Sequence, residues 1–187
     1  MHGKVNGTLV TQMGPFPAGT HYSALDPDLL LWVHATLVDS ALLVHSQWVG
    51  ELRAEDEEAY YEDAKTLALL FGTPPEVIPQ TLTDFRRYMD SMLESDEICV
   101  TDTAHEIART VLRPPLPLAL RPAIEAVNLI TASLMPPRLR REYGIAWDPV
   151  RAALLTGSRE WVKRIAMPLL PGRLRRVPKA RGYPAPR

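Results

Sequence analysis

The clearest pattern of hydrophobic and polar positions begins at Pro27 and predicts a long helix. Asp26 precedes it, and a carboxylate at that position can accept hydrogen bonds from the free N–H groups of a first helical turn. Pro27 suits the first helical position because its missing N–H would have no partner there, and Asp28 suits the positive end of the helix dipole. Together, these three residues predict a helix start at Pro27.

The segment that follows, 29–49, is apolar on most of its faces. A helix of this composition is normally enclosed by other helices. We therefore predict that it is the central buried helix of the fold, with Leu30 and Leu37 in the core. Its polar interruptions are His34, Thr36, Asp39, Ser40 and His45.

Amphipathic segments continue along the rest of the chain. Apolar residues at helical spacing, with Gly or Pro between the runs, predict helices over 54–71, 83–94, 101–112, 124–135, 138–143 and 149–169. Strand signals are weak, since a brief alternation at 8–13 ends at Gly14 and Pro15. The eighteen prolines lie mainly between the predicted helices. The pattern therefore predicts an all-α fold, a single-domain helical bundle.

Composition changes this picture little. A chain of 187 residues that is 46% hydrophobic with a formal net charge of -1 is typical of a soluble globular domain. Segment 29–49 is long enough to span a bilayer, but its two histidines, one aspartate and several hydroxyl groups favour a buried protein helix. The N-terminus lacks a basic start followed by an apolar run, so we expect a cytoplasmic protein. The single cysteine, Cys99, excludes an intrachain disulfide and a multi-cysteine zinc site.

Charge divides the chain into an acidic body and a basic tail. Residues 171–187 hold six of the 21 basic residues and no acid, which leaves 15 basic residues against 22 acidic ones before them. A nucleic-acid-binding arm is one interpretation, but four prolines and a single tyrosine better suit a tail that wraps on the acidic body or is solvated. We predict a domain over 1–170 and a basic, Pro-rich tail over 171–187 with no role in nucleic-acid recognition.

Familiar catalytic motifs are absent or incomplete. His105 and Glu106 begin like a zinc-protease helix, but Arg109 stands where the second histidine ligand belongs. Cys99 and His105 could form a thiol–imidazole pair, yet the acidic residues before Cys99 offer nothing that would activate the thiol. A Gly-x-Ser-x-Gly elbow, a phosphate-binding glycine loop and a dinucleotide fingerprint are also lacking. The histidines of segment 29–49 are therefore the better candidates.

His34 and His45 lie eleven residues apart in this segment. At 1.5 Å per residue they are about 16 Å apart along a helix, so they cannot bind the same metal ion. From the residues alone, two interpretations of each stay open: a core histidine bonded to a carbonyl or hydroxyl group, and a cofactor ligand.

Short motifs run along nearly the whole chain, and the block from Tyr22 to Ser40 is the most specific of them. The motifs are Met1-His2 with Val5 and Gly7, Tyr22-Ser23-Ala24, Asp26-Pro27, 30–38, Val49-Gly50, Tyr60-Tyr61, Pro79 with Thr81, Arg121-Pro122, 136–140, Tyr143-Gly144 and 168–171. Together they resemble the MpaB-type oxygenase family, which includes the catalytic domain of rubber oxygenase, or latex clearing protein. They correspond to the C-terminal two-thirds of the family domain, without the N-terminal helical segment that members usually carry.

The resemblance implies an all-α domain that binds haem b and uses dioxygen to oxidise or cleave an apolar, often isoprenoid, substrate. The position that matches the family's proximal haem ligand is His2, although Asn6 stands in place of a flanking arginine. His34 matches a family Trp-Val-His pattern that falls near a pocket residue. The resemblance thus ranks His2 first and His34 second as the iron ligand, with Thr36 or Asp39 supporting the site.

The sequence therefore predicts a haem-b-dependent oxygenase that acts on an apolar, lipid-like or isoprenoid small molecule with dioxygen. The alternative is a non-enzymatic helical binding module, a truncated family member that binds a partner or lipid in its groove. A third interpretation, a nucleic-acid-binding regulator, rests on the basic tail alone. We expect the 187-residue chain to bind haem weakly or not at all, and a chain extended upstream to bind it stoichiometrically.

Overall fold

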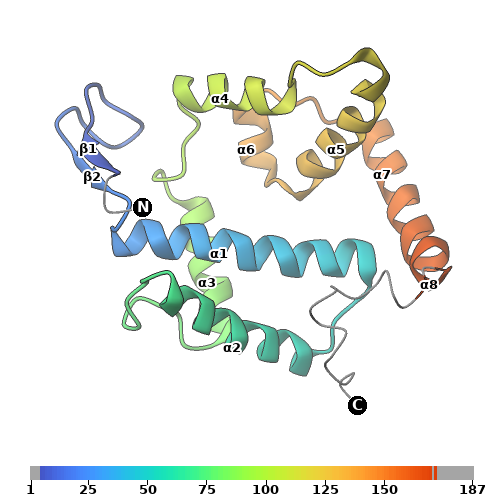
Figure 1. Cartoon of the computed structure of the whole chain (residues 1–187), viewed down its shortest axis with the longest axis horizontal. Coiled ribbons are helices and arrows are strands. Elements are labelled where there is room, and N and C mark those ends of the chain that lie inside the picture. The colour runs from blue at the N-terminus through green and yellow to red at the C-terminus, as the bar shows by residue number, and fades with distance from the viewer. Residues whose placement is uncertain (1–4, 170, 172–187) are drawn as a thin grey trace.

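The computed structural model describes residues 5–169 and 171, and these residues form a mainly helical fold (Figure 1). The elements in chain order are β1 (Asn6–Thr8), β2 (His21–Ser23), α1 (Pro27–Val44), η2 (His45–Val49), α2 (Ala54–Leu70), α3 (Leu82–Glu94), α4 (Asp102–Leu112), η3 (Leu118–Leu120), α5 (Arg121–Leu134), α6 (Pro137–Glu142), α7 (Pro149–Trp161), η4 (Val162–Ala166) and α8 (Met167–Leu169). Apart from Pro171, the predicted basic tail lies outside the described residues.

The two strands pair antiparallel at the N-terminal end of α1. Gly7 lies opposite Tyr22, and a β-carbon at Gly7 would come within 2.7 Å of the tyrosine hydroxyl. Only glycine therefore leaves room for the Tyr22 ring to lie across β1.

Capping hydrogen bonds confirm the predicted helix starts at Pro27 and Pro149, whereas α3 begins one residue and α5 three residues earlier than predicted. The Asp26 side chain accepts from the backbone N–H of Asp28 at 2.9 Å, which fixes the start of α1 at Pro27. Thr81, Thr101 and Asp148 cap α3, α4 and α7 in the same way. The chain thus begins each of these helices at a side chain that satisfies an N–H group of the first turn.

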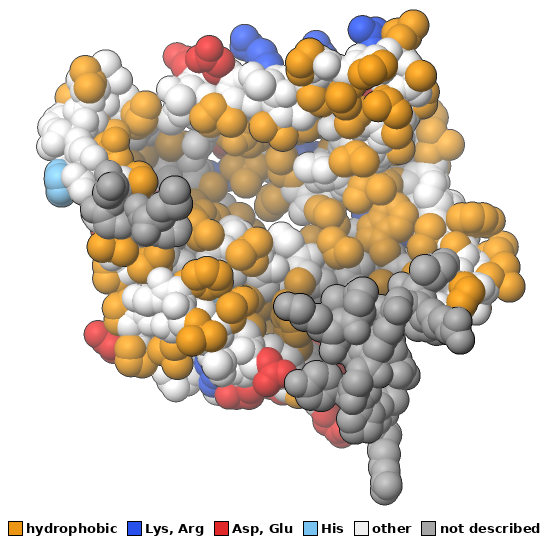
Figure 2. All heavy atoms as spheres, in the orientation of Figure 1, with side chains coloured by type: hydrophobic (Ala, Val, Ile, Leu, Met, Phe, Trp, Pro, Cys, Tyr) orange, Lys and Arg blue, Asp and Glu red, His pale blue; other side chains and the backbone are white. Residues whose placement is uncertain are grey.

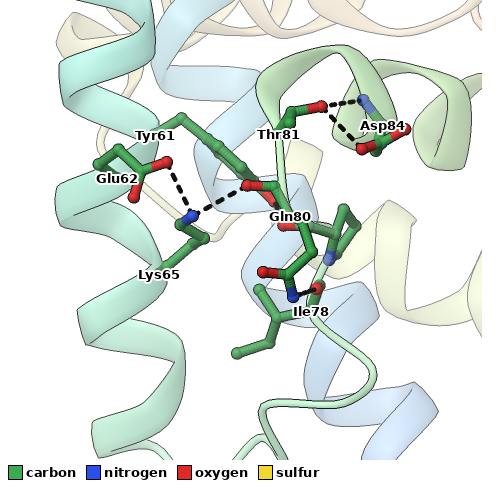
Figure 3. Close-up of polar contacts among 8 residues, drawn as sticks. Tyr61, Glu62, Lys65, Ile78, Gln80, Thr81 and Asp84 are labelled. Atoms are coloured by element: carbon green, nitrogen blue, oxygen red, sulfur yellow. Dashed lines mark hydrogen bonds and ion pairs between the residues drawn. The ribbon is translucent and has the colours of Figure 1, made fainter.

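The main core lies where α1, α2 and α3 pack together. Its buried residues are Ala35, Val38, Tyr61, Ala64, Leu82, Phe85 and Met89. The rings of Tyr61 and Phe85 lie 5.0 Å apart between centroids, and the Tyr61 hydroxyl donates to the carbonyl of Pro79 at 2.6 Å. Figure 3 shows Lys65 on the same helix, where its ammonium group bonds to both Glu62 and the carbonyl of Gln80. These contacts fix α2 against the loop that precedes α3.

The second group of helices, α4 to α7, lies on the other side of α1 in Figure 1. Helix α5 contacts both α1 and α7, and α7 with η4 returns to contact η2 at the end of α1. Figure 2 shows this face hollowed between α1 and the helices above it, with hydrophobic side chains around the hollow. Helix α1 therefore separates two packed groups of helices.

Helix α1 is buried on one side only. Its interior residues are Leu31, His34, Ala35 and Val38. Leu37 is 59% exposed, so its predicted place in the core is wrong, and Leu30 is half-buried. The cause is that α2 and α3 cover one side of α1 while its opposite side is only partly covered. By length and composition alone, Pro27–Val49 is also the one helical stretch among the described residues that could cross a membrane.

Candidate functional site

His34 lies on the interior side of α1 and is one of two buried polar residues in the described part of the chain, the other being Thr73. Its side chain is buried, with 6% of the residue exposed, and neither ring nitrogen has a hydrogen-bond partner. Burial lowers the pKa of His34, because removal from water disfavours the charged imidazolium. The side chain is therefore a neutral imidazole whose two nitrogens are both unengaged. Since buried polar groups are nearly always bonded, this arrangement calls for a ligand or a further partner.

His45 differs from His34 in this respect. It begins the π-helical turn η2, and its Nδ1 lies 3.0 Å from the carbonyl oxygen of Gly50. This bond closes the end of the helix, so a structural role accounts for His45. Of the two interpretations that the sequence left open, the bonded core histidine applies to His45, while His34 lacks such a bond.

The two residues expected to support the site do not bond to His34. The Thr36 hydroxyl donates to the carbonyl of Val33 within α1, at 2.9 Å. Asp39 is half-buried, and its pKa is raised by burial and by the neighbouring carboxylate of Asp90 on α3. Asp39 thus interacts with the α3 side of the helix. His2, ranked first as the iron ligand, lies outside the described residues.

The other candidate residues are not assembled into a site. Cys99 is exposed, and its thiol packs against Gly14 of the N-terminal loop. The His105 ring instead packs edge-on against Tyr143, at 5.7 Å between centroids. Among residues 5–169 and 171, no cluster of three or more His, Cys, Asp or Glu side chains could hold a metal ion.

An apolar groove of about 1110 Å³ runs between α5 and α7 and reaches η2. Its lining residues are Trp48, Ala126, Leu129, Ile130, Pro149, Val150, Ala153, Leu154, Leu155, Gly157, Ser158, Trp161 and Val162. Sequence reasoning missed this groove because Trp48 lies 78 residues before Ala126, the first α5 residue that lines the groove. The only sequence signal was the apolar spacing in α5 and α7, which any packed helix would show.

A second cavity, of about 630 Å³, lies between α4 and α5 and is more polar. His105, Arg109 and Tyr143 are among its lining residues, and it shares Leu129 and Leu154 with the groove. His34 lines neither of these cavities. A group that reaches the His34 nitrogens must therefore displace side chains that now cover them.

Comparison with known families gives a match over most of the chain. The model of the family described as "ER-bound oxygenase mpaB/B'/Rubber oxygenase, catalytic domain" matches residues 1–164.

Two similar proteins come from mycobacteria. They are the uncharacterized protein Mb2261 of Mycobacterium bovis and the uncharacterized protein Rv2237 of Mycobacterium tuberculosis. Each is 28% identical over 158 residues, which cover 81% of this chain and 59% of the relative. The chain thus spans about three-fifths of the length of these relatives. No solved structure shows a significant match.

Proposed function

The chain belongs to the family of ER-bound oxygenase mpaB/B' and rubber oxygenase catalytic domains, and from this premise we propose that it is a haem-b-dependent oxygenase acting on an apolar small molecule. The family supports the reaction class, the use of dioxygen and a small-molecule substrate. The mainly α fold agrees with what the resemblance implied. Haem, substrate and the residues that hold them are our proposal.

The observation that carries the haem proposal is the unengaged imidazole of His34. A haem needs an imidazole in its neutral form and an apolar enclosure. His34 meets the first need, because burial lowers its pKa and no described residue competes for its nitrogens. Leu31, Ala35 and Val38 on the same side of α1 supply apolar side chains for the second. The chemistry of these residues suits the group, which would have to displace the side chains that now cover the His34 nitrogens.

From the resemblance we propose that His2 would hold the haem iron, and that His34 would offer an imidazole to the bound group that can donate or accept one hydrogen bond. When bound, haem supplies the iron at which dioxygen is activated. The protein's own part is to exclude water from this site, through the apolar side chains of α1, and to keep His34 neutral. A neutral imidazole can donate a proton from one nitrogen while its other nitrogen accepts.

Dioxygen uptake by the haem-loaded chain tests this proposal. With squalene as an isoprenoid substrate, we expect uptake matched by an oxidised product in mass spectrometry, and none with hexadecane. His34→Ala should lower the rate at least about tenfold, the effect of losing one hydrogen bond of about 1.4 kcal/mol. His45→Ala is the matched control, because His45 is bonded to Gly50 away from the proposed pocket. Absence of uptake above that of free haem would refute the oxygenase assignment.

A second candidate function is a non-enzymatic helical binding module. The apolar groove favours it, because Trp48 at the groove lies fourteen residues from His34, or about 21 Å along the helix. In this case the groove would bind an apolar ligand without chemistry. Such a protein would bind its ligand equally well with and without haem.

A further inference from the structure

The junction of η2, α5 and α7 contains a half-buried arginine without a carboxylate partner. Arg159 donates from Nη2 to the Ser133 hydroxyl at 2.9 Å, and its guanidinium lies over the Trp48 ring, 5.6 Å from the centroid. Its Nε is buried and has no acceptor, and no acid in the described part of the chain forms an ion pair with it. Burial lowers the pKa of Arg159, which reflects the cost of this unpaired charge.

Arg164 shows the ordinary arrangement, in which an arginine pairs with an acidic side chain. Arg164, five residues further along the chain, forms an ion pair with Glu160 at 2.8 Å and is largely exposed. Arg159 is less exposed and lacks an acid. The unpaired Arg159 is thus less exposed than the paired Arg164. Stability alone would favour the reverse, because an unpaired charge is better placed in water.

This arginine lies beside the apolar groove, among residues that line it. Leu155 and Ser158 on α7 and Val162 at the start of η4 precede or follow Arg159 within four residues, and all three line the groove. Trp48 of η2 also lines the groove, and the Arg159 guanidinium lies over its ring. The indole Nε1 of Trp48 is also buried without an acceptor. Two unmet hydrogen-bond donors, one of them charged, therefore lie beside a long apolar surface.

We propose that the groove binds a long-chain carboxylate, with the alkyl chain along α5 and α7 and the carboxylate on the Nε and Nη2 edge of Arg159. That edge is a planar fork that matches the two oxygens of a carboxylate, and a single negative charge balances the single unpaired cation. The Trp48 indole is the second donor for the same group. The apolar lining suits the chain, and a groove of about 1110 Å³ is large enough for a ligand of this size.

This inference does not rest on haem or on the oxygenase assignment. The Arg159 Nε is covered by neighbouring side chains, so the head group must move one of them to reach it. Trp48 lies directly against the guanidinium and is the side chain we expect to move. Tryptophan fluorescence of the haem-free chain therefore reports binding directly.

The experiment titrates the chain with dodecanoate and with methyl dodecanoate, both below the concentration at which micelles form. We expect saturable binding of dodecanoate with a Kd at least about tenfold lower than that of the ester, because only the acid offers a charge to Arg159. Arg159→Met should remove this preference while keeping binding of the ester. Arg164→Met, the matched control, should keep the preference.

Equal Kd values of acid and ester for the wild-type chain would overturn the proposal, as would absence of saturable binding. A preference for the acid that survives in a folded Arg159→Met would do the same, because the carboxylate would then bind elsewhere. Circular dichroism establishes that the variant is folded. If it is not, the acid and ester comparison on the wild-type chain decides alone.

Discussion

At the scale of single residues, the unusual side chains are those whose polar atoms lack partners. Sequence reasoning selected His34 as an interruption of an apolar segment, and the structure places it inside, with both nitrogens unengaged. It could not separate His34 from His45, because both interrupt the same apolar segment, and only the backbone turn at Gly50 gives His45 its partner. Arg159 was not selected at all, because an arginine in an amphipathic helix is normally solvated.

The lowered pKa of His34 predicts a pH-dependent stability. The unfolded chain takes up the proton near pH 6.5 and the folded chain at lower pH, so the stability present above pH 6.5 is lost as the pH falls through this window. The slope attributable to His34 is at most about 1.4 kcal/mol per pH unit. Denaturant unfolding at several pH values between 7.5 and 5.5 measures it. His34→Gln should flatten the slope, and a slope unchanged from the wild type would contradict the buried neutral imidazole.

The raised pKa of Asp39 predicts that its effect on stability changes with pH in the opposite direction. Burial and the Asp90 carboxylate raise its pKa, so at neutral pH its charge destabilises the folded chain, and the penalty disappears as the pH falls below its folded pKa. Asp39→Asn should therefore raise the Tm at pH 7 by a few degrees and leave it nearly unchanged at about pH 3, where Asp39 is protonated. Asp90→Asn should raise the Tm at pH 7 as well. A lower Tm for both variants would show that the two carboxylates do not repel each other.

At the scale of elements, helix starts could be predicted and burial could not. Capping by Asp26, Thr101 and Asp148 is a local interaction, so the sequence alone indicates it. The π-helical turns η2 and η4 interrupt segments that the pattern predicted as continuous helices, because the apolar spacing is nearly the same in both forms. Which side of α1 is covered depends on where α2, α3 and α5 pack, and segment 29–49 carries no such information.

Two leucines test the burial of the core directly. Leu82 is 2% exposed in the cluster formed by α1, α2 and α3, whereas Leu37 on α1 is 59% exposed. Leu82→Ala should lower the free energy of unfolding by about 2–5 kcal/mol, because it leaves a cavity in a packed core. Leu37→Ala, the same change on a more exposed residue, should lower it by less than about 1 kcal/mol. Equal losses in denaturant unfolding would mean that the exposed side of α1 is covered in solution.

At the scale of the whole molecule, the mainly α fold and the family follow from pattern and motifs that run along the chain. The groove does not, because its walls come from η2, α5 and α7 and meet only after the chain has folded. His34 lies in α1, and the groove meets the same helical stretch further along, at Trp48 in η2. The chemistry that we propose at His34 and the apolar ligand that we propose for the groove therefore have different locations in the molecule.

The central claim is that α1 contributes His34 to a haem pocket, and a haem titration of the chain followed at the Soret band tests it most directly. The account predicts a saturable band in which His2→Ala weakens haem affinity at least about tenfold and His34→Ala shifts the band without removing it. His45→Ala should reproduce the wild-type titration. A spectrum that stays that of free haem throughout, or a band that neither His2→Ala nor His34→Ala changes, would contradict the account.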